Sequence, residues 1–136
     1  MSRHILIVDT DALLRHSLAF NLKKAGYRVS TAATAEDAIR QARLDPPDLV
    51  LLDTDLPGLE SGILLRNLRQ RINVPIVFLT TRCRELRQEL AIPGVDDYVT
   101  MPFDIDRLLD SIEAVLRQAP LKPEGDIIRQ ASREET

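Results

Sequence analysis

Two short stretches of this sequence, IVDTDALL at residues 7–14 and LLDTDLPG at residues 51–58, share one pattern. In each stretch an apolar run of strand-forming residues ends in Asp-Thr-Asp. In an open α/β sheet, ligands bind beyond the carboxyl ends of the strands, near the point where the strand order reverses. The pattern therefore indicates an α/β protein with a candidate site that includes Asp9 and Asp53.

Apolar runs and amphipathic segments alternate along the rest of the chain. The apolar runs are short and rich in β-branched residues, and we expect strands at 4–8, 28–31, 49–52, 76–79 and 97–99. Helices are expected between them, from about residue 13 to Ala25-Gly26, then at 35–44, 60–70 and 84–90, and last after Pro102-Phe103. This alternation predicts a parallel sheet with helices on both of its faces.

Local signals support two of these helices. Thr34 is a predicted N-cap with Asp37 three positions later, and Asp104 is a predicted cap for the last helix. An apolar stripe at helical spacing follows Asp104 and consists of Ile105, Leu108, Leu109, Ile112, Val115 and Leu116. The last helix should therefore bury one face against the sheet.

The composition limits the classes of function. The 136 residues, of which 44% are hydrophobic and 29% are charged, fit one globular domain. The net charge of −3 offers no basic face for nucleic acid, so we expect no direct contact with it. No apolar run approaches the roughly 20 residues of a membrane span, and the first residues lack the apolar core of a signal peptide. We expect a cytoplasmic protein that does not enter a membrane, and the single Cys83 agrees with a reducing compartment.

The composition changes near the end of the chain. Pro120, Pro123 and Gly125 interrupt helix formation, and residues 126–136 are mostly polar. We therefore expect one domain over residues 1–118. Residues 119–136 are either a flexible tail or the start of a linker to an output domain.

The two strand-end aspartates carry the chemical prediction. If the first and third strands are neighbours, the carboxylates of Asp9 and Asp53 lie close together, and like charges repel unless a cation lies between them. A hard divalent cation such as Mg²⁺, which keeps several waters, fits such a pair. The alternative for either residue alone is an ordinary turn or capping aspartate.

Four ordered motifs extend this pattern, and together they are specific. They are ILIVD at 5–9, PDLVLLDTDLPG at 47–58, VPIVFLT at 74–80 and DDYVTMPF at 96–103. Over residues 3–118 the chain resembles the receiver domain of two-component response regulators. The resemblance implies a flavodoxin-like, three-layer (βα)5 fold with a five-stranded parallel sheet in the order 2-1-3-4-5.

The resemblance also implies roles for particular residues. Asp53 matches the residue that accepts a phosphoryl group from a histidine kinase or phosphotransfer protein, and Asp9 matches the metal-binding acid on the first strand. Asp55 matches the residue whose backbone carbonyl binds the metal. Thr80 matches the switch hydroxyl, and Tyr98 matches the switch aromatic. The expected cofactor is Mg²⁺.

Two positions depart from the family pattern. The family usually has a second acid where this chain has Thr10, and a lysine where it has Met101. Asp11 is a candidate compensating acid, although a solvated loop acid is the alternative. The attraction between a lysine and a carboxylate about 4 Å apart is worth roughly 4 kcal/mol at an effective dielectric near 20, before desolvation, and Met101 cannot supply it. We therefore expect a weakened metal site and a weakened switch.

Three functions remain open at this stage. The first is a phosphorelay receiver, not an enzyme, that signals through the face of the fourth helix, fifth strand and fifth helix, which is also a candidate homodimer surface. The second is a degenerate receiver-like module that binds a partner without phosphorylation. The third is a haloacid-dehalogenase-like phosphatase, because IVDTD fits that nucleophile motif, although Leu13 departs from it. Arg82, Arg84 and Arg87 are either partner contacts or a solvated basic face.

Overall fold

The computed structural model describes residues 3–53, 66, 70, 74–80, 97–100 and 104–118. Its elements, in chain order, are β1 (His4–Val8), α1 (Ala12–Lys24), β2 (Arg28–Ala32), α2 (Ala35–Leu44), β3 (Leu49–Asp53), β4 (Ile76–Thr80), β5 (Asp97–Thr100) and α5 (Ile105–Gln118). The helices expected at 60–70 and 84–90 lie outside the described residues, apart from Arg66 and Gln70, which are helical and exposed. Within the described parts of the chain, no helix is both long and apolar enough to span a bilayer.

The described strands form one parallel sheet in the order β2-β1-β3-β4-β5. This order is the one predicted from the resemblance, and it makes β1 and β3 neighbours. Each strand from β2 to β5 continues one residue beyond its predicted end. Because of that extension, Asp53 and Thr80 are the last residues of β3 and β4 rather than the first residues of loops.

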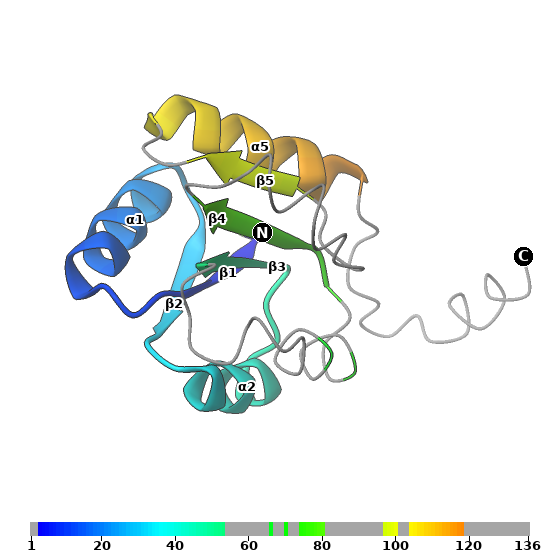
Figure 1. Ribbon diagram of the computed structural model, residues 1–136. Helices are drawn as coiled ribbons and strands as arrows, with labels where there is room; N and C mark the ends of the chain where they lie inside the picture. Colours follow the sequence, from blue (N-terminus) through cyan, green and yellow to red (C-terminus); the bar gives the residue numbers. More distant parts are fainter. Residues whose placement is uncertain are drawn as a thin grey trace, which may run out of the picture.

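Helices cover both faces of the sheet (Figure 1). On one face, α1 and α5 pack against alternate residues of the central strands, with Leu18, Leu22, Leu108 and Ile112 fully or almost fully buried. On the other face, α2 packs through Ala38 and Ala42. The residues of β1, β3 and β4 are buried along their whole length, as expected for a parallel sheet with two covered faces. Each buried leucine or isoleucine contributes about 1.5–3 kcal/mol to this arrangement.

The predicted helix starts and the last apolar stripe are confirmed. The Thr34 hydroxyl accepts from the backbone N–H of Asp37, and Asp104 accepts from the backbone N–H of Arg107. In α5 the buried residues are Leu108, Ile112 and Leu116, with the other stripe residues packed beside them. Side-chain caps therefore set the first turn of α2 and of α5.

The predicted helix after the first strand is present, but its apolar residues do not all face inward. Leu18 and Leu22 are buried, whereas Leu13 is 81% exposed. Five residues separate Leu13 from Leu18, which at 100° per residue turns Leu13 about 140° away from the core-facing side. Phe20 is also exposed, with the Lys24 ammonium 5.8 Å from its ring centroid.

The amino ends of the strands hold a separate polar cluster around His4, a buried residue. Its ring Nε2 lies 2.7 Å from the Ser30 hydroxyl, and its backbone N–H donates to the Asp48 carboxylate at 2.7 Å. The backbone N–H of Asp48 in turn donates to the His4 carbonyl at 2.6 Å. This histidine is bonded within the fold at the edge of the sheet opposite Asp9 and Asp53.

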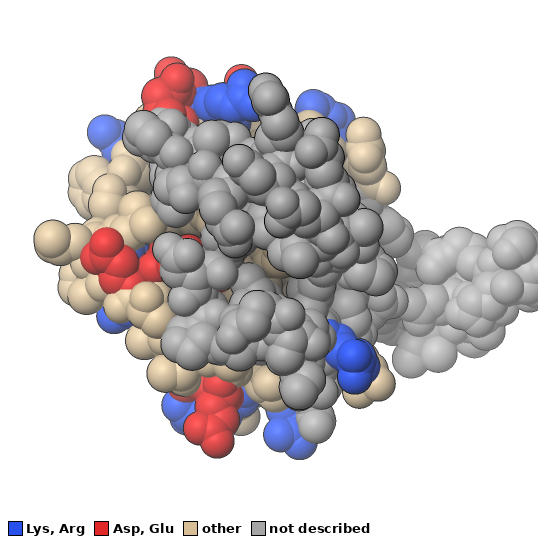
Figure 2. Space-filling model, viewed as in Figure 1, with Lys and Arg blue, Asp and Glu red and all other residues tan. Residues whose placement is uncertain are grey.

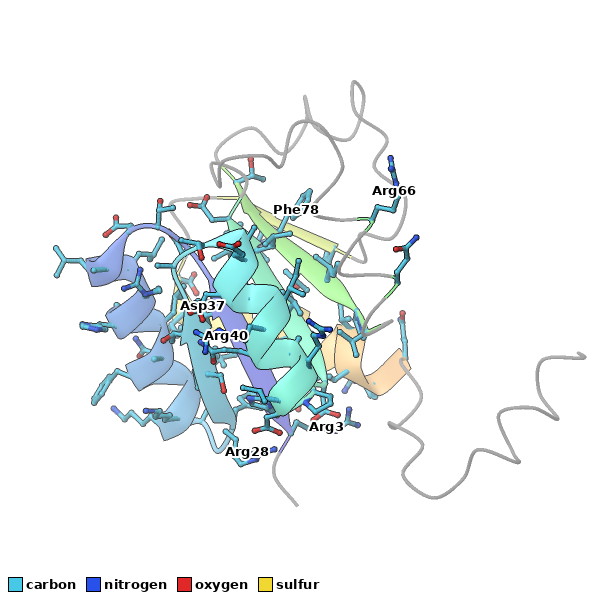
Figure 3. The ribbon with its side chains drawn as sticks, turned by 90° about the horizontal axis from the view of Figure 1, so that it is seen from below. Arg3, Arg28, Asp37, Arg40, Arg66 and Phe78 are labelled. Carbon is cyan, nitrogen blue, oxygen red and sulfur yellow. The ribbon has the colours of Figure 1, made fainter. Side chains whose placement is uncertain are left out.

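Charged side chains of both signs surround the visible face. Figure 2 shows Lys and Arg interspersed with Asp and Glu around its described margin. On α2, Figure 3 shows Asp37 and Arg40 together, and these two side chains form an ion pair one turn apart. Exposed pairs of this kind contribute little to stability, about 0.3–0.5 kcal/mol. Burial, and not surface charge, therefore accounts for most of the stability of this sheet.

Gly26 ends α1 in a Schellman arrangement. Its N–H donates to the Lys23 carbonyl at 3.0 Å, and the N–H of Tyr27 donates to the Leu22 carbonyl at 3.1 Å. Gly26 has φ of 104°, and a Cβ added there would meet no atom within 4 Å. The cost of a side chain at this position is therefore backbone strain rather than a clash.

We expect Gly26→Ala to lower the free energy of unfolding by about 1–2 kcal/mol, because L-residues with a side chain disfavour positive φ. Gly26→Asn should cost less, because asparagine tolerates this region better. Urea denaturation followed by circular dichroism measures both. Equal midpoints for wild type and both variants would show that the turn is not strained.

Candidate functional site

Polar side chains that are buried gather at the carboxyl edge of the sheet. Asp9 is 0% exposed, Asp53 5% and Thr80 0%. Asp9 follows β1, Asp53 ends β3 and Thr80 ends β4, and these three strands are adjacent in the sheet. The register pairs Val8 with Leu52 and Asp53 with Leu79, so Asp9 and Asp53 follow directly on neighbouring strands and Thr80 lies one residue further along β4.

Asp9 and Asp53 directly follow the register pair Val8 and Leu52 of adjacent strands, and the carboxyl group of Asp53 is close enough to raise the pKa of Asp9. The pKa of Asp9 is raised from 3.8 to about 6, chiefly by burial, with smaller contributions from the carboxyl group of Asp53 and the charge of Asp11. A hydrogen bond from the backbone N–H of Asp11 opposes part of this effect. The predicted proximity of the two strand-end aspartates is therefore confirmed, and bringing them together costs free energy once both are ionised.

One oxygen of Asp9 is left without a donor. Oδ1 accepts from the backbone N–H of Asp11 at 2.9 Å, whereas Oδ2 is buried and has no hydrogen-bond partner in the described structure. A carboxylate oxygen of this kind, beside a second carboxylate, fits a hard cation better than it fits any side chain present. Within the described ranges, no three or more His, Cys, Asp or Glu side chains are placed so that they could together hold a metal ion. The donor set therefore suits a cation that keeps most of its waters, such as Mg²⁺.

Asp11 stabilises the start of α1 at this edge of the sheet. It is the N-cap of α1, and its Oδ1 accepts from the backbone N–H groups of Leu13 and Leu14 at 3.0 and 3.3 Å. Its position directly before the first helical residue is a capping signal, which the sequence reading did not use. Thr10, where the family usually has its second acid, is exposed. Whether Asp11 also contributes to cation binding stays a prediction.

Other predicted site residues are only partly described. Tyr98 lies in β5, paired in register with Phe78 on β4, but its side chain is outside the described structure. Asp55 and Met101 lie outside the described residues. Their assigned roles stay predictions.

Arg15 was not predicted as part of this region. It lies on the first turn of α1, is half-buried, and its Nη1 donates to the backbone carbonyl of Asp9 at 2.9 Å. A cap at Asp11 places residue 15 in the first helical turn, where a long side chain can reach back to the end of the preceding strand. An aspartate N-cap followed by an arginine in the first helical turn is therefore the sequence signal that could have identified Arg15.

An acidic hollow lies on the side of the sheet formed by β5 and α5. Its volume is about 530 Å³, and its lining residues are Asp97, Val99, Asp104, Asp106, Arg107, Asp110 and Ser111. The Ser111 hydroxyl donates to the Asp97 carboxylate, and Asp104 caps α5. Asp106 and Asp110 are exposed, so their carboxylates face solvent.

Comparison with known proteins gives a consistent family. Residues 5–113 match the response regulator receiver domain. The receiver domain of a sensor histidine kinase from Pseudomonas aeruginosa, solved with a magnesium ion coordinated in its active site cleft, is 27% identical with a TM-score of 0.76, covering 87% of this chain and 100% of that one. The chemotaxis protein CheY4 of Vibrio cholerae is 27% identical with a TM-score of 0.76, covering 85% and 99%. The non-phosphorylated HemR receiver domain of Leptospira biflexa is 27% identical with a TM-score of 0.75, covering 89% and 99%.

We expect Asp9→Asn to raise the free energy of unfolding at pH 7.5 in EDTA, by about 1–2 kcal/mol after allowance for solvent screening. The asparagine oxygen can keep the bond from Asp11, and its NH₂ group can donate to Asp53, so repulsion is replaced by a hydrogen bond. Saturating Mg²⁺ should stabilise the wild type more than the variant. Urea denaturation with and without Mg²⁺ measures both effects, and the exposed Asp110→Asn is the matched control.

The difference in unfolding free energy between Asp9→Asn and the wild type should depend on pH. Because the folded pKa of Asp9 is raised from 3.8 to about 6, the folded state binds more protons between these values. The unfolding free energy of the wild type therefore falls as pH rises through this window. The difference between Asp9→Asn and wild type should grow from about pH 4 to about pH 6 and then stay constant. A difference independent of pH, or a variant less stable than wild type at pH 7.5, would contradict the raised pKa of Asp9 and the cost of burying its charge beside Asp53.

Proposed function

Because this chain belongs to the response regulator receiver family, we propose that Asp53 accepts a phosphoryl group from a histidine kinase or a histidine phosphotransfer protein. The observation that carries this proposal is the buried pair of Asp9 and Asp53 on adjacent strands, with Oδ2 of Asp9 lacking a donor. An anionic pair at the carboxyl edge of an open α/β sheet is suited to cation-assisted phosphoryl transfer.

The proposed transfer forms an acyl phosphate. A carboxylate oxygen of Asp53 attacks the phosphorus of a phosphohistidine, the P–N bond breaks, and the departing imidazole takes up a proton. Asp53 is consumed stoichiometrically, so the chain acts as an acceptor and not as an enzyme. Catalysis in such transfers comes mainly from positioning and charge neutralisation. The rigid, fully buried ends of β1 and β3 support that positioning.

Asp9 and Asp53 are the described residues that would hold Mg²⁺, with the backbone carbonyl of Asp55 as the third protein ligand expected from the resemblance. When bound, the ion neutralises charge on the carboxylates and on the phosphoryl oxygens. Without it, ionised Asp9 would repel an incoming anionic phosphoryl group. The raised pKa of Asp9, due chiefly to burial, supports a need for a cation at this site.

Thr80 is the proposed reporter of phosphorylation. It ends β4, directly beside β3, and is 0% exposed. A hydroxyl at this level of the sheet can donate to an oxygen of a phosphoryl group on Asp53. Tyr98 on β5, the neighbouring strand, is the proposed aromatic partner of this switch. Movement would then pass from β4 to the side of the sheet that β5 and α5 form.

A second candidate is a receiver-like module that binds its partner without phosphorylation. The exposed Thr10 in place of an acid, and Met101 in place of a lysine, favour it. Two carboxylates without the usual lysine should still allow transfer, only more slowly, because the missing cation removes one stabilising charge and not the nucleophile. For that reason we propose the phosphorelay receiver ahead of the phosphorylation-independent module. We also propose that the protein is cytoplasmic.

The acidic hollow supports a proposed signalling and dimer surface on β5 and α5. Asp106 and Asp110 are exposed there, while Arg82, Arg84 and Arg87 occur in the segment expected to hold the fourth helix. In an isologous dimer, each chain offers both patches to its partner, so acidic and basic groups pair twice. Charge complementarity of this kind favours self-association that weakens with salt.

Incubation with Mg²⁺ and a small phosphodonor should add one phosphoryl group, about 80 Da by its formula, through the acyl-phosphate chemistry of a carboxylate nucleophile. Intact-mass spectrometry measures it, and Asp53→Asn should remove it. Asp48→Asn, a carboxylate at the opposite edge of the sheet, is the matched control and should keep the adduct. An unmodified wild type would favour the phosphorylation-independent module. Hydrolysis of a generic phosphate ester over many turnovers would instead support a phosphatase.

Asp110→Lys should weaken self-association of the phosphorylated protein by about tenfold, since it replaces an attraction by a repulsion across the dimer. Sedimentation velocity at low and moderate salt measures the dissociation constant. Glu36→Lys makes the same charge change on exposed α2 and should leave it unaltered. A monomer under every condition, or equal effects of both substitutions, would refute this surface.

A further inference from the structure

Each polar atom of Asp9 but one has a partner, and each partner comes from a different segment. The backbone N–H donates to the Ala32 carbonyl at the end of β2, at 3.1 Å. The backbone carbonyl accepts from Nη1 of Arg15 on α1, at 2.9 Å. Oδ1 accepts from the backbone N–H of Asp11 in the turn between β1 and α1, at 2.9 Å. Together these bonds leave Oδ2 as the unpartnered atom.

Arg15 closes this arrangement from the helix side. Its own backbone N–H donates to the Asp11 carbonyl at 2.9 Å, which is the first helical bond of α1. Its guanidinium then returns to the strand end that precedes the helix. In the described structure Arg15 forms no ion pair; the bond that it forms with its charged end goes to a neutral carbonyl. A surface arginine kept only for solubility would not need this geometry.

We propose that Arg15 is a positioning residue that holds Asp9 in place, so that its unpartnered Oδ2 would be available to a cation bound by Asp9 and Asp53. The bond to the Asp9 carbonyl restrains rotation of that residue at the point where β1 ends and the turn begins. This restraint acts on a pair that has neither a second acid at Thr10 nor a lysine at Met101 beside it. With fewer ligands, cation affinity depends more strongly on the orientation of each one.

This inference rests on the proposed function only for the identity of the cation. The restraint on Asp9 exists with or without a metal, and it has its own readout. If Arg15 holds Asp9, loss of its guanidinium should loosen the bond between the Asp11 N–H and Oδ1 of Asp9. Hydrogen exchange of the Asp11 amide should then accelerate in EDTA.

The test uses Arg15→Met, which keeps much of the half-buried apolar stem but removes every donor. Arg43→Met, on exposed α2, makes the same change in charge and is the matched control. We expect the dissociation constant for Mg²⁺, measured by isothermal titration calorimetry, to rise about tenfold in Arg15→Met, as for other residues that orient a metal ligand. It should change less than about twofold in Arg43→Met, because screened surface charges contribute little.

Arg15→Lys is the rescue variant. Its shorter cation should give an intermediate dissociation constant and an intermediate Asp11 exchange rate. Equal Mg²⁺ affinities for Arg15→Met and Arg43→Met, with unchanged Asp11 exchange, would overturn the proposal. If Arg15→Met does not fold and Arg15→Lys binds Mg²⁺ as the wild type does, Arg15 has only a structural role, and the proposal fails.

A wild type that binds no Mg²⁺ would count against the metal in the proposed function. The hydrogen-exchange rate of the Asp11 amide would then show, independently of metal binding, whether Arg15 restrains Asp9. Faster exchange in Arg15→Met than in Arg43→Met supports the restraint, and equal rates refute it.

Discussion

The burial of two neighbouring carboxylates is the constraint around which this domain is arranged. Asp9 and Asp53 are almost inaccessible to water, and burial raises the pKa of Asp9 to about 6. Near neutral pH the fold therefore holds two like charges together at a cost in stability. A cation bound beside the two carboxylates would offset that cost.

The rest of the fold stabilises the domain enough to offset the cost of burying these two carboxylates. Parallel strands covered by α1 and α5 on one face and α2 on the other supply enough buried apolar area to outweigh it (Figure 1). The register of β1 with β3 leaves the two aspartates no means of separating without breaking the ladder between them. The turn after β1 adds further restraint, because Asp11 caps α1 while its N–H holds Oδ1 of Asp9. The buried strands thus provide most of the stability of the domain, whereas the candidate site residues lie at the ends of these strands.

Particular residues show how far sequence patterns reach. Thr34 and Asp104 were predictable caps because capping depends on contacts within a few residues. Leu13 is exposed although it is apolar, because it lies on the side of the first turn of α1 that faces away from the core. Arg15 was missed, because its partner is a backbone carbonyl, which leaves no mark in the sequence. Asp11 was predicted as a possible compensating acid, which stays a prediction, and the structure shows that it caps α1.

The sequence by itself determined the alternation of strands and helices, the family, and the identity of the two acids, because these follow from local periodicity and from short ordered motifs. Tertiary structure alone decided that Asp9 and Asp53 meet, that Oδ2 of Asp9 is left without a donor, and that a guanidinium from α1 holds the carbonyl of Asp9. Strand order and register are set by non-local packing of both sheet faces. Distances between residues 9 and 53 therefore depend on the whole core, and not on any segment near either residue.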